Sequence, residues 1–79
     1  MAISDDAYNK ARDILVKAGS QTAQKSHMKH TQGKGSPEAH GVALLKEARD
    51  EFNGMPDPAK TTGRAAVVKA AQQMSITKW

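Results

Sequence analysis

The chain has 79 residues, a formal net charge of +4 and a sequence pI near 9.6. This length predicts one domain over residues 1–79, because an independent core usually needs more than about 50 residues. Cysteine is absent, which excludes disulfide bonds, and no apolar run approaches the roughly 18 residues of a membrane span.

Alanine dominates the apolar residues, with thirteen copies against eleven for leucine, isoleucine, valine and phenylalanine together. Alanine buries little surface, so we expect a thin core and marginal stability as a monomer. Small scaffolds of this kind commonly gain stability from a second subunit or a bound partner. The start of the chain, Met1–Asp6, is acidic where a signal peptide is basic. We therefore expect a cytoplasmic protein.

The first predicted helix covers about residues 4–18. Ser4 is a good N-cap, and Asp5 and Asp6 place negative charge in the first turn. Gly19 is placed to end the helix. The apolar positions recur at helical spacing and comprise Ala7, Tyr8, Ala11, Ile14, Leu15 and Ala18.

Residues 19–35 are predicted to form a long polar loop. They show no sustained apolar period and end in the Gly33–Gly35 stretch. A short polar helix over 22–30 is the alternative, because only glycine and the β-branched threonines argue against it.

The second predicted helix covers residues 36–53. Ser36 and Pro37 form an N-cap followed by a proline at the first helical position. Gly54 is predicted as the residue that ends the helix, and Pro56 prevents its continuation. Its apolar face comprises Leu44, Leu45, Ala48 and Phe52, and Gly41 permits close approach one turn earlier.

The third predicted helix covers about 58–75. Asp57 and Pro58 offer a cap and a proline at the first position, although Thr61 could delay the start by one turn. The predicted inward face consists of small residues that let another helix approach closely: Gly63, Ala66, Val67, Ala70, Ala71 and Met74. The sequence therefore predicts an all-α, three-helix domain.

Two segments, 14–37 and 58–79, contain no acidic residue and four Lys or Arg each. If they lay on one face they would form a positive surface suited to the phosphate backbone of nucleic acid. The Gly33–Ser36 loop would bring backbone amides close to a phosphate. The predicted nucleic-acid-binding residues are Lys17, Lys25, Lys29, Lys34, Lys60, Arg64 and Lys69. A solvated surface without a ligand is the plainer interpretation.

No catalytic framework is recognisable, so we expect a protein that is not an enzyme and has no cofactor. His27 and His30 lie three residues apart and His40 follows, but the acids and cysteines that usually complete a zinc site are missing. We therefore predict no metal site. The Gly33–Ser36 stretch lacks the full phosphate-loop spacing.

The favoured function is a small basic helical module that acts on nucleic acid or a nucleoprotein complex, of the type found among accessory proteins of phages and mobile elements. The alternative is a protein–protein adaptor, an inhibitor or a virion structural component that docks or self-associates through the third helix and the tail. For this alternative the predicted contact residues are Phe52, Met74 and Trp79. Trp79 either completes the core or stays exposed as an anchor for a partner. No membrane or small-molecule substrate is expected.

Overall fold

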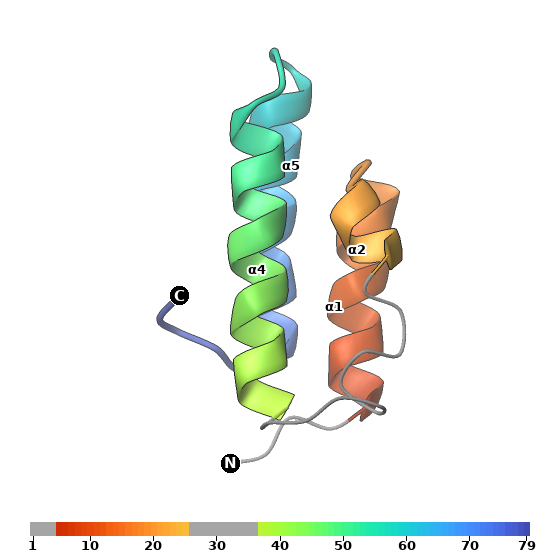
Figure 1. Ribbon diagram of the computed structural model, residues 1–79, viewed down its shortest axis with the longest axis vertical. Helices are drawn as coiled ribbons and strands as arrows, with labels where there is room; N and C mark the ends of the chain where they lie inside the picture. Colours follow the sequence, from red (N-terminus) through yellow and green to blue (C-terminus); the bar gives the residue numbers. More distant parts are fainter. Residues whose placement is uncertain (1–4, 26–36) are drawn as a thin grey trace.

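The computed structural model describes residues 5–25 and 37–79. The described chain is all-α: α1 (Asp5–Lys17), α2 (Gln21–Lys25), α4 (Pro37–Asn53) and α5 (Ala59–Gln73). The three long helices run side by side, with α5 antiparallel to both α1 and α4 (Figure 1). The predicted all-α domain with three long helices is confirmed.

Helix α1 follows its predicted pattern. Tyr8, Ala11 and Leu15 are buried on one face. The predicted N-cap Ser4 lies outside the described residues. At the other end, Gly19 has φ +104. Its N–H donates to the Val16 carbonyl at 3.0 Å, and the Ser20 N–H donates to the Leu15 carbonyl at 2.9 Å. This Schellman ending, with glycine in the left-handed region, confirms Gly19 as the stop.

The prediction of a continuous loop over 19–35 is wrong at its start, because α2 forms there. Ser20 caps this helix: its hydroxyl accepts a hydrogen bond from the Ala23 N–H at 3.0 Å. Ala23 is fully buried and fixes α2 to the core. The alternative of a short helix in this region was nearer the structure. Residues 26–36, which hold the rest of the predicted loop, lie outside the described residues.

Helix α4 ends at Asn53 as predicted, but by a different mechanism. Gly54 does not adopt a positive φ. Instead the Gly54 N–H donates to Glu51 at 3.2 Å and the Met55 N–H to Phe52 at 3.0 Å, which tightens the last turn into 3₁₀ geometry. Gly54 is therefore confirmed as the residue that follows the helix, although it does not adopt the left-handed conformation common for glycine at this position.

Helix α5 begins at Ala59, with Pro58 in the capping position rather than inside the first turn. Asp57 supplies the cap one residue earlier, since its carboxylate accepts from the Thr61 N–H at 3.2 Å and the Thr61 hydroxyl at 2.8 Å. At the other end Ser75 has φ 55, and the Ile76 N–H donates to Ala71 at 2.9 Å. A second Schellman ending thus closes α5, with serine in the position that favours glycine.

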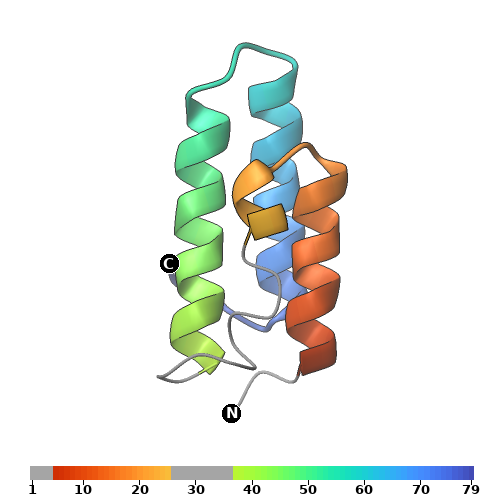
Figure 2. The same cartoon turned by 45° about the vertical axis from the view of Figure 1, so that its right-hand side comes forward.

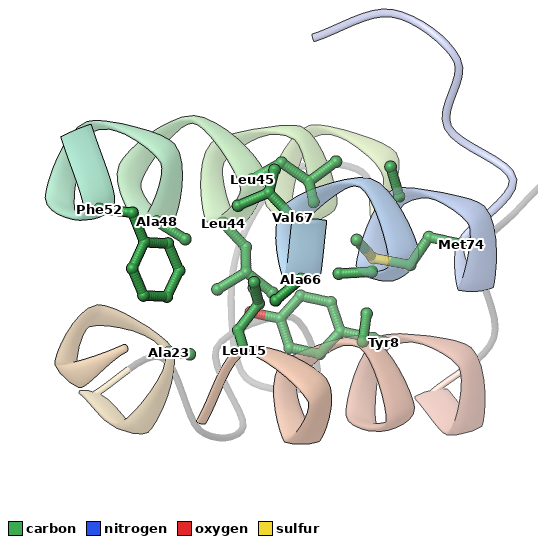
Figure 3. Close-up of a cluster of buried hydrophobic side chains, with 13 residues drawn as sticks. Tyr8, Leu15, Ala23, Leu44, Leu45, Ala48, Phe52, Ala66, Val67 and Met74 are labelled. Carbon is green, nitrogen blue, oxygen red and sulfur yellow. The ribbon is translucent and has the colours of Figure 1, made fainter. Parts of the chain in front are cut away.

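Helix α5 packs along both α1 and α4, whereas α1 and α4 make few contacts with each other and α2 bridges them (Figure 2). Gly63 permits the close approach of α4, because a Cβ there would lie 2.6 Å from Phe52 Cδ2 and closer still to two other ring atoms. The Phe52 ring points from α4 toward Ala23 of α2 (Figure 3). The small inward face predicted for α5 is confirmed in every position.

In the described parts of the chain, six of the thirteen buried hydrophobic residues are alanines, so the core is as thin as the composition predicts. The largest fully buried side chains are Tyr8, Phe52, Leu15, Leu44 and Leu45. Within 5–25 and 37–79, no helix combines the length and apolar character required to cross a membrane.

Candidate nucleic-acid interface

The two lysines of α1 each pair with an acid one turn earlier. Lys10 lies 3.4 Å from the Asp6 carboxylate, and Lys17 lies 3.0 Å from Asp13. These i, i+4 pairs are exposed, so each contributes only a few tenths of a kcal/mol, about 0.3–0.5. Their consequence for function is that α1 presents little net charge to a partner.

The cations of α5 are in a different situation. This helix contains Lys60, Arg64 and Lys69 and no acidic residue. No carboxylate in the described parts of the chain forms an ion pair with any of the three. Arg64 and Lys69 are exposed, and Lys60 is half-buried. Helix α5 therefore carries three cations and no acid, whereas in α1 and α4 the acids equal or outnumber the lysines and arginines.

Between these cations the surface of α5 is nearly neutral and made of small side chains. A shallow hollow of about 320 Å³ is lined by Thr61, Arg64, Ala65 and Val68. Val68 is 48% exposed, and no other large hydrophobic side chain in the described parts of the chain is exposed. A surface of this kind allows the backbone of α5 to approach a ligand closely.

The cations flank this hollow on two sides. Since an α-helix turns by about 100° per residue, Lys60 and Arg64 project within about 40° of each other and Lys69 projects about 140° from Arg64. Lys60 and Lys69 are separated by about 13.5 Å along the helix axis at 1.5 Å per residue. We call the set Lys60, Thr61, Arg64, Ala65, Val68 and Lys69 the α5 strip.

The structure does not place the other predicted nucleic-acid-binding residues in the α5 strip. Lys17 lies at the end of α1 in its pair with Asp13. Lys25 ends α2, which packs against α1 and α4. Lys29 and Lys34 lie outside the described residues, as does the Gly33–Ser36 loop.

Two of the residues predicted to contact a protein partner belong to the core. Phe52 is 0% exposed and Met74 is 4% exposed. Trp79 is partly buried and packs against the core cluster from the tail, which turns back beside α4 (Figure 1). Of the two outcomes posed for Trp79, the structure shows the one in which it adds to the core.

Of the three histidines weighed as metal ligands, the structure describes one. His40 lies in α4, and His27 and His30 lie outside the described residues. Among residues that the structure does describe, no group of three His, Cys, Asp or Glu side chains is arranged to hold an ion.

Sequence reasoning missed a polar cluster that fixes α2. The Glu51 carboxylate of α4 accepts hydrogen bonds from the Ser20 hydroxyl at 2.6 Å and the Gln21 N–H at 2.8 Å. It also accepts from the Thr22 N–H at 3.3 Å. Desolvation by itself would raise the pKa of Glu51, but these hydrogen bonds together outweigh it and hold the pKa below its ordinary value.

The other end of α2 is held from α1. Arg12 Nε donates to the Ala23 carbonyl at 2.9 Å, and Nη2 donates to the Gln24 carbonyl at 3.4 Å. A carboxylate at the start and a guanidinium at the end of a helix both match its dipole. The cluster is satisfied internally, so it positions α2 rather than offering a site for a ligand.

Comparison of the chain with protein-family models, with curated proteins and with solved structures found no match.

Proposed function

We propose that this protein is a non-catalytic binding module that acts on nucleic acid, alone or within a nucleoprotein complex, through the α5 strip. The observation that carries the proposal is the contrast between helices: α1 pairs its lysines with acids, whereas the three cations of α5 are unpaired and exposed or half-exposed. Cations left free in this way release counterions when they neutralise phosphates, which is the main source of affinity for nucleic acid.

The hollow supports the same proposal. Small side chains at Ala65 and Thr61 let a nucleic acid come near the helix, so the cations on both flanks can reach its phosphates without steric conflict. The Thr61 hydroxyl is engaged with Asp57, so its role there is to limit bulk rather than to donate to a phosphate. Contact of this kind is independent of base sequence.

The experiment compares two triple variants with equal loss of charge. One carries Lys60→Ala, Arg64→Ala and Lys69→Ala, and the control carries Lys10→Ala, Lys17→Ala and Lys46→Ala. Fluorescence anisotropy with labelled oligonucleotides at low ionic strength measures their affinities. We expect the wild-type affinity to fall with salt with a log–log slope of about −2.7 for three phosphate contacts.

The α5 triple variant should lose this binding, and the control should keep most of it. Equal loss in both variants would show that only net charge matters and would contradict a role for the α5 strip. Absence of binding by the wild type to both duplex and single strands at low salt would refute the proposed function.

A protein partner is the second candidate, and the exposure of Val68 favours it. The inward small-residue face of α5, on which this alternative partly rested, is already covered by α1 and α4. What remains for docking is the outer face, where the charge favours an acidic partner and opposes a second copy of this chain. Binding to an acidic protein with no affinity for nucleic acid would support this candidate.

A further inference from the structure

The aromatic residues of this chain are not placed to stack on bases. The sequence contains one each of tyrosine, phenylalanine and tryptophan. Tyr8 is 1% exposed and Phe52 is 0% exposed. Trp79 packs against the core from the tail. Proteins that bind single strands rely on exposed aromatic side chains for stacking, so the structure disfavours a single-stranded ligand.

The α5 strip has the form of a helix surface that enters a groove. Its centre, Ala65 and Val68, is small and free of charge, and its cations lie on both flanks. Helix α5 is also accessible, since α1 and α4 cover only its inward face. The major groove of B-form DNA is about 12 Å wide and admits an α-helix.

Dimensions and chemistry agree with this placement. Arg64 and Lys69 project about 140° apart, so in a groove they point toward opposite walls. Each wall of the groove is a phosphate backbone, which either cation can neutralise. Ala65 and Val68 then face the base edges, where apolar side chains contact the thymine methyl group. A-form RNA is a poorer match, because its major groove is deep and narrow.

We propose that α5 binds double-stranded B-form DNA by lying in the major groove, with Arg64 and Lys69 on the phosphates of the two strands. This inference rests on the proposed function and names its ligand. It assigns Ala65 the role of keeping the helix surface low enough to enter the groove.

The test uses the full chain and three probes of one sequence: a 20-base-pair DNA duplex, its single strand and the corresponding RNA duplex. The variant Ala65→Trp adds bulk at an exposed position of the strip and leaves the net charge unchanged. We expect it to weaken binding to the DNA duplex by about tenfold, the scale of one lost groove contact. The matched control Ala43→Trp places the same bulk on the exposed side of α4 and should not affect binding.

A second measurement separates the major groove from contact with the outside of the duplex. Methylation of guanine N7 modifies only the major groove, and we expect it to reduce binding of the wild type. Equal affinity for single-stranded and duplex DNA would overturn the groove inference. So would a duplex affinity that changes neither on N7 methylation nor in Ala65→Trp. Either result would leave nucleic-acid binding intact. Failure of all three probes to bind would instead refute the proposed function itself.

Discussion

Glu51 of α4 and Arg12 of α1 hold opposite ends of the same short helix, α2. The carboxylate receives the first N–H groups of the helix, at 2.8 Å for Gln21, and the guanidinium donates to its final carbonyls, at 2.9 Å for Ala23. Helix ends leave these groups without partners inside the helix. A helix of five residues has little intrinsic stability, so α2 depends on these two side chains and on the burial of Ala23.

Replacement of the carboxylate should therefore loosen α2. We expect Glu51→Gln to lower the free energy of unfolding by about 1–2 kcal/mol, because a neutral amide accepts these hydrogen bonds more weakly than a carboxylate does. Urea denaturation followed by circular dichroism measures the change. Glu47→Gln, an exposed position on the same helix, is the control and should be nearly neutral. Equal stability of the two variants would argue against the role assigned to Glu51.

The same carboxylate gives a pH dependence of known sign. The pKa of Glu51 in the folded state lies below its ordinary value of 4.5. Its contribution is therefore complete above about pH 4.5 and is lost as the pH falls through the lower folded pKa. Unfolding free energies of the wild type and Glu51→Gln should converge as the pH falls through that range. A difference that stays constant down to pH 2 would contradict this linkage.

Loss of the guanidinium should affect α2 more than the rest of the fold. In Arg12→Lys, a single ammonium group replaces the guanidinium that donates to two carbonyls, so the last turn of α2 should fray. We expect faster amide exchange within α2 and little change in the core of α5. Arg64→Lys is a control on an exposed arginine. Unchanged exchange in α2 of Arg12→Lys would show that burial of Ala23 alone holds the helix.

Two glycines provide a test of packing between α4 and α5. A Cβ on Gly63 overlaps the Phe52 ring, so Gly63→Ala should destabilise the protein by about 1–3 kcal/mol. At Gly54, the nearest atom to a new Cβ is the Glu51 carbonyl oxygen at 3.5 Å, an ordinary contact. Gly54→Ala should therefore be neutral or stabilising by up to about 1 kcal/mol. Thermal melts of both variants check the contrast, and similar melting temperatures would disprove the close approach.

The endings of α1 and α5 provide a second matched pair. Ser75 adopts φ 55, where glycine is at no disadvantage, so Ser75→Gly should stabilise the protein by about 0.5–1 kcal/mol. Gly19 has φ +104, and Gly19→Ala should destabilise it by about 1 kcal/mol or more. In a domain of this size these changes shift the melting temperature by several degrees, about 4–8 °C per kcal/mol. A loss of stability in Ser75→Gly would contradict the account of this helix end.

Local patterns were sufficient to predict the long helices. The apolar spacing around Leu15, Leu44 and Val67 identified faces that are buried, and Gly19 correctly marked the end of α1. The small inward face of α5 was also predictable, because Gly63 and the alanines recur at helical spacing.

Helix α2 was not predictable in the same way. Its stabilising acid, Glu51, lies 31 residues from Ser20 in the sequence, so no local window shows an acidic first turn. Ser20 itself was a signal, as an N-cap residue directly after the glycine that ends α1. The sequence placed the end of α4 correctly at Asn53, but it could not show the conformation of Gly54, because glycine adopts both signs of φ readily.

For the candidate site, the sequence identified cations but not which of them are free. Lys17 and Arg64 both stand in basic segments, yet only Lys17 has an acid one helical turn before it within its own helix. The i, i+4 spacing of Asp13 and Lys17 predicts their pair from the sequence alone, whereas the structure was required to show that no described element brings a carboxylate to Arg64.

The most direct test of the central claim is a map of the surface that contacts DNA. Addition of a 12-base-pair duplex at low salt to the isotopically labelled protein should shift the backbone amide resonances of Thr61, Arg64, Ala65, Val68 and Lys69, with the exposed faces of α1 and α4 little affected. Such a pattern would place the duplex on the α5 strip. Shifts centred on α1 or α4, or none at all, would contradict the account.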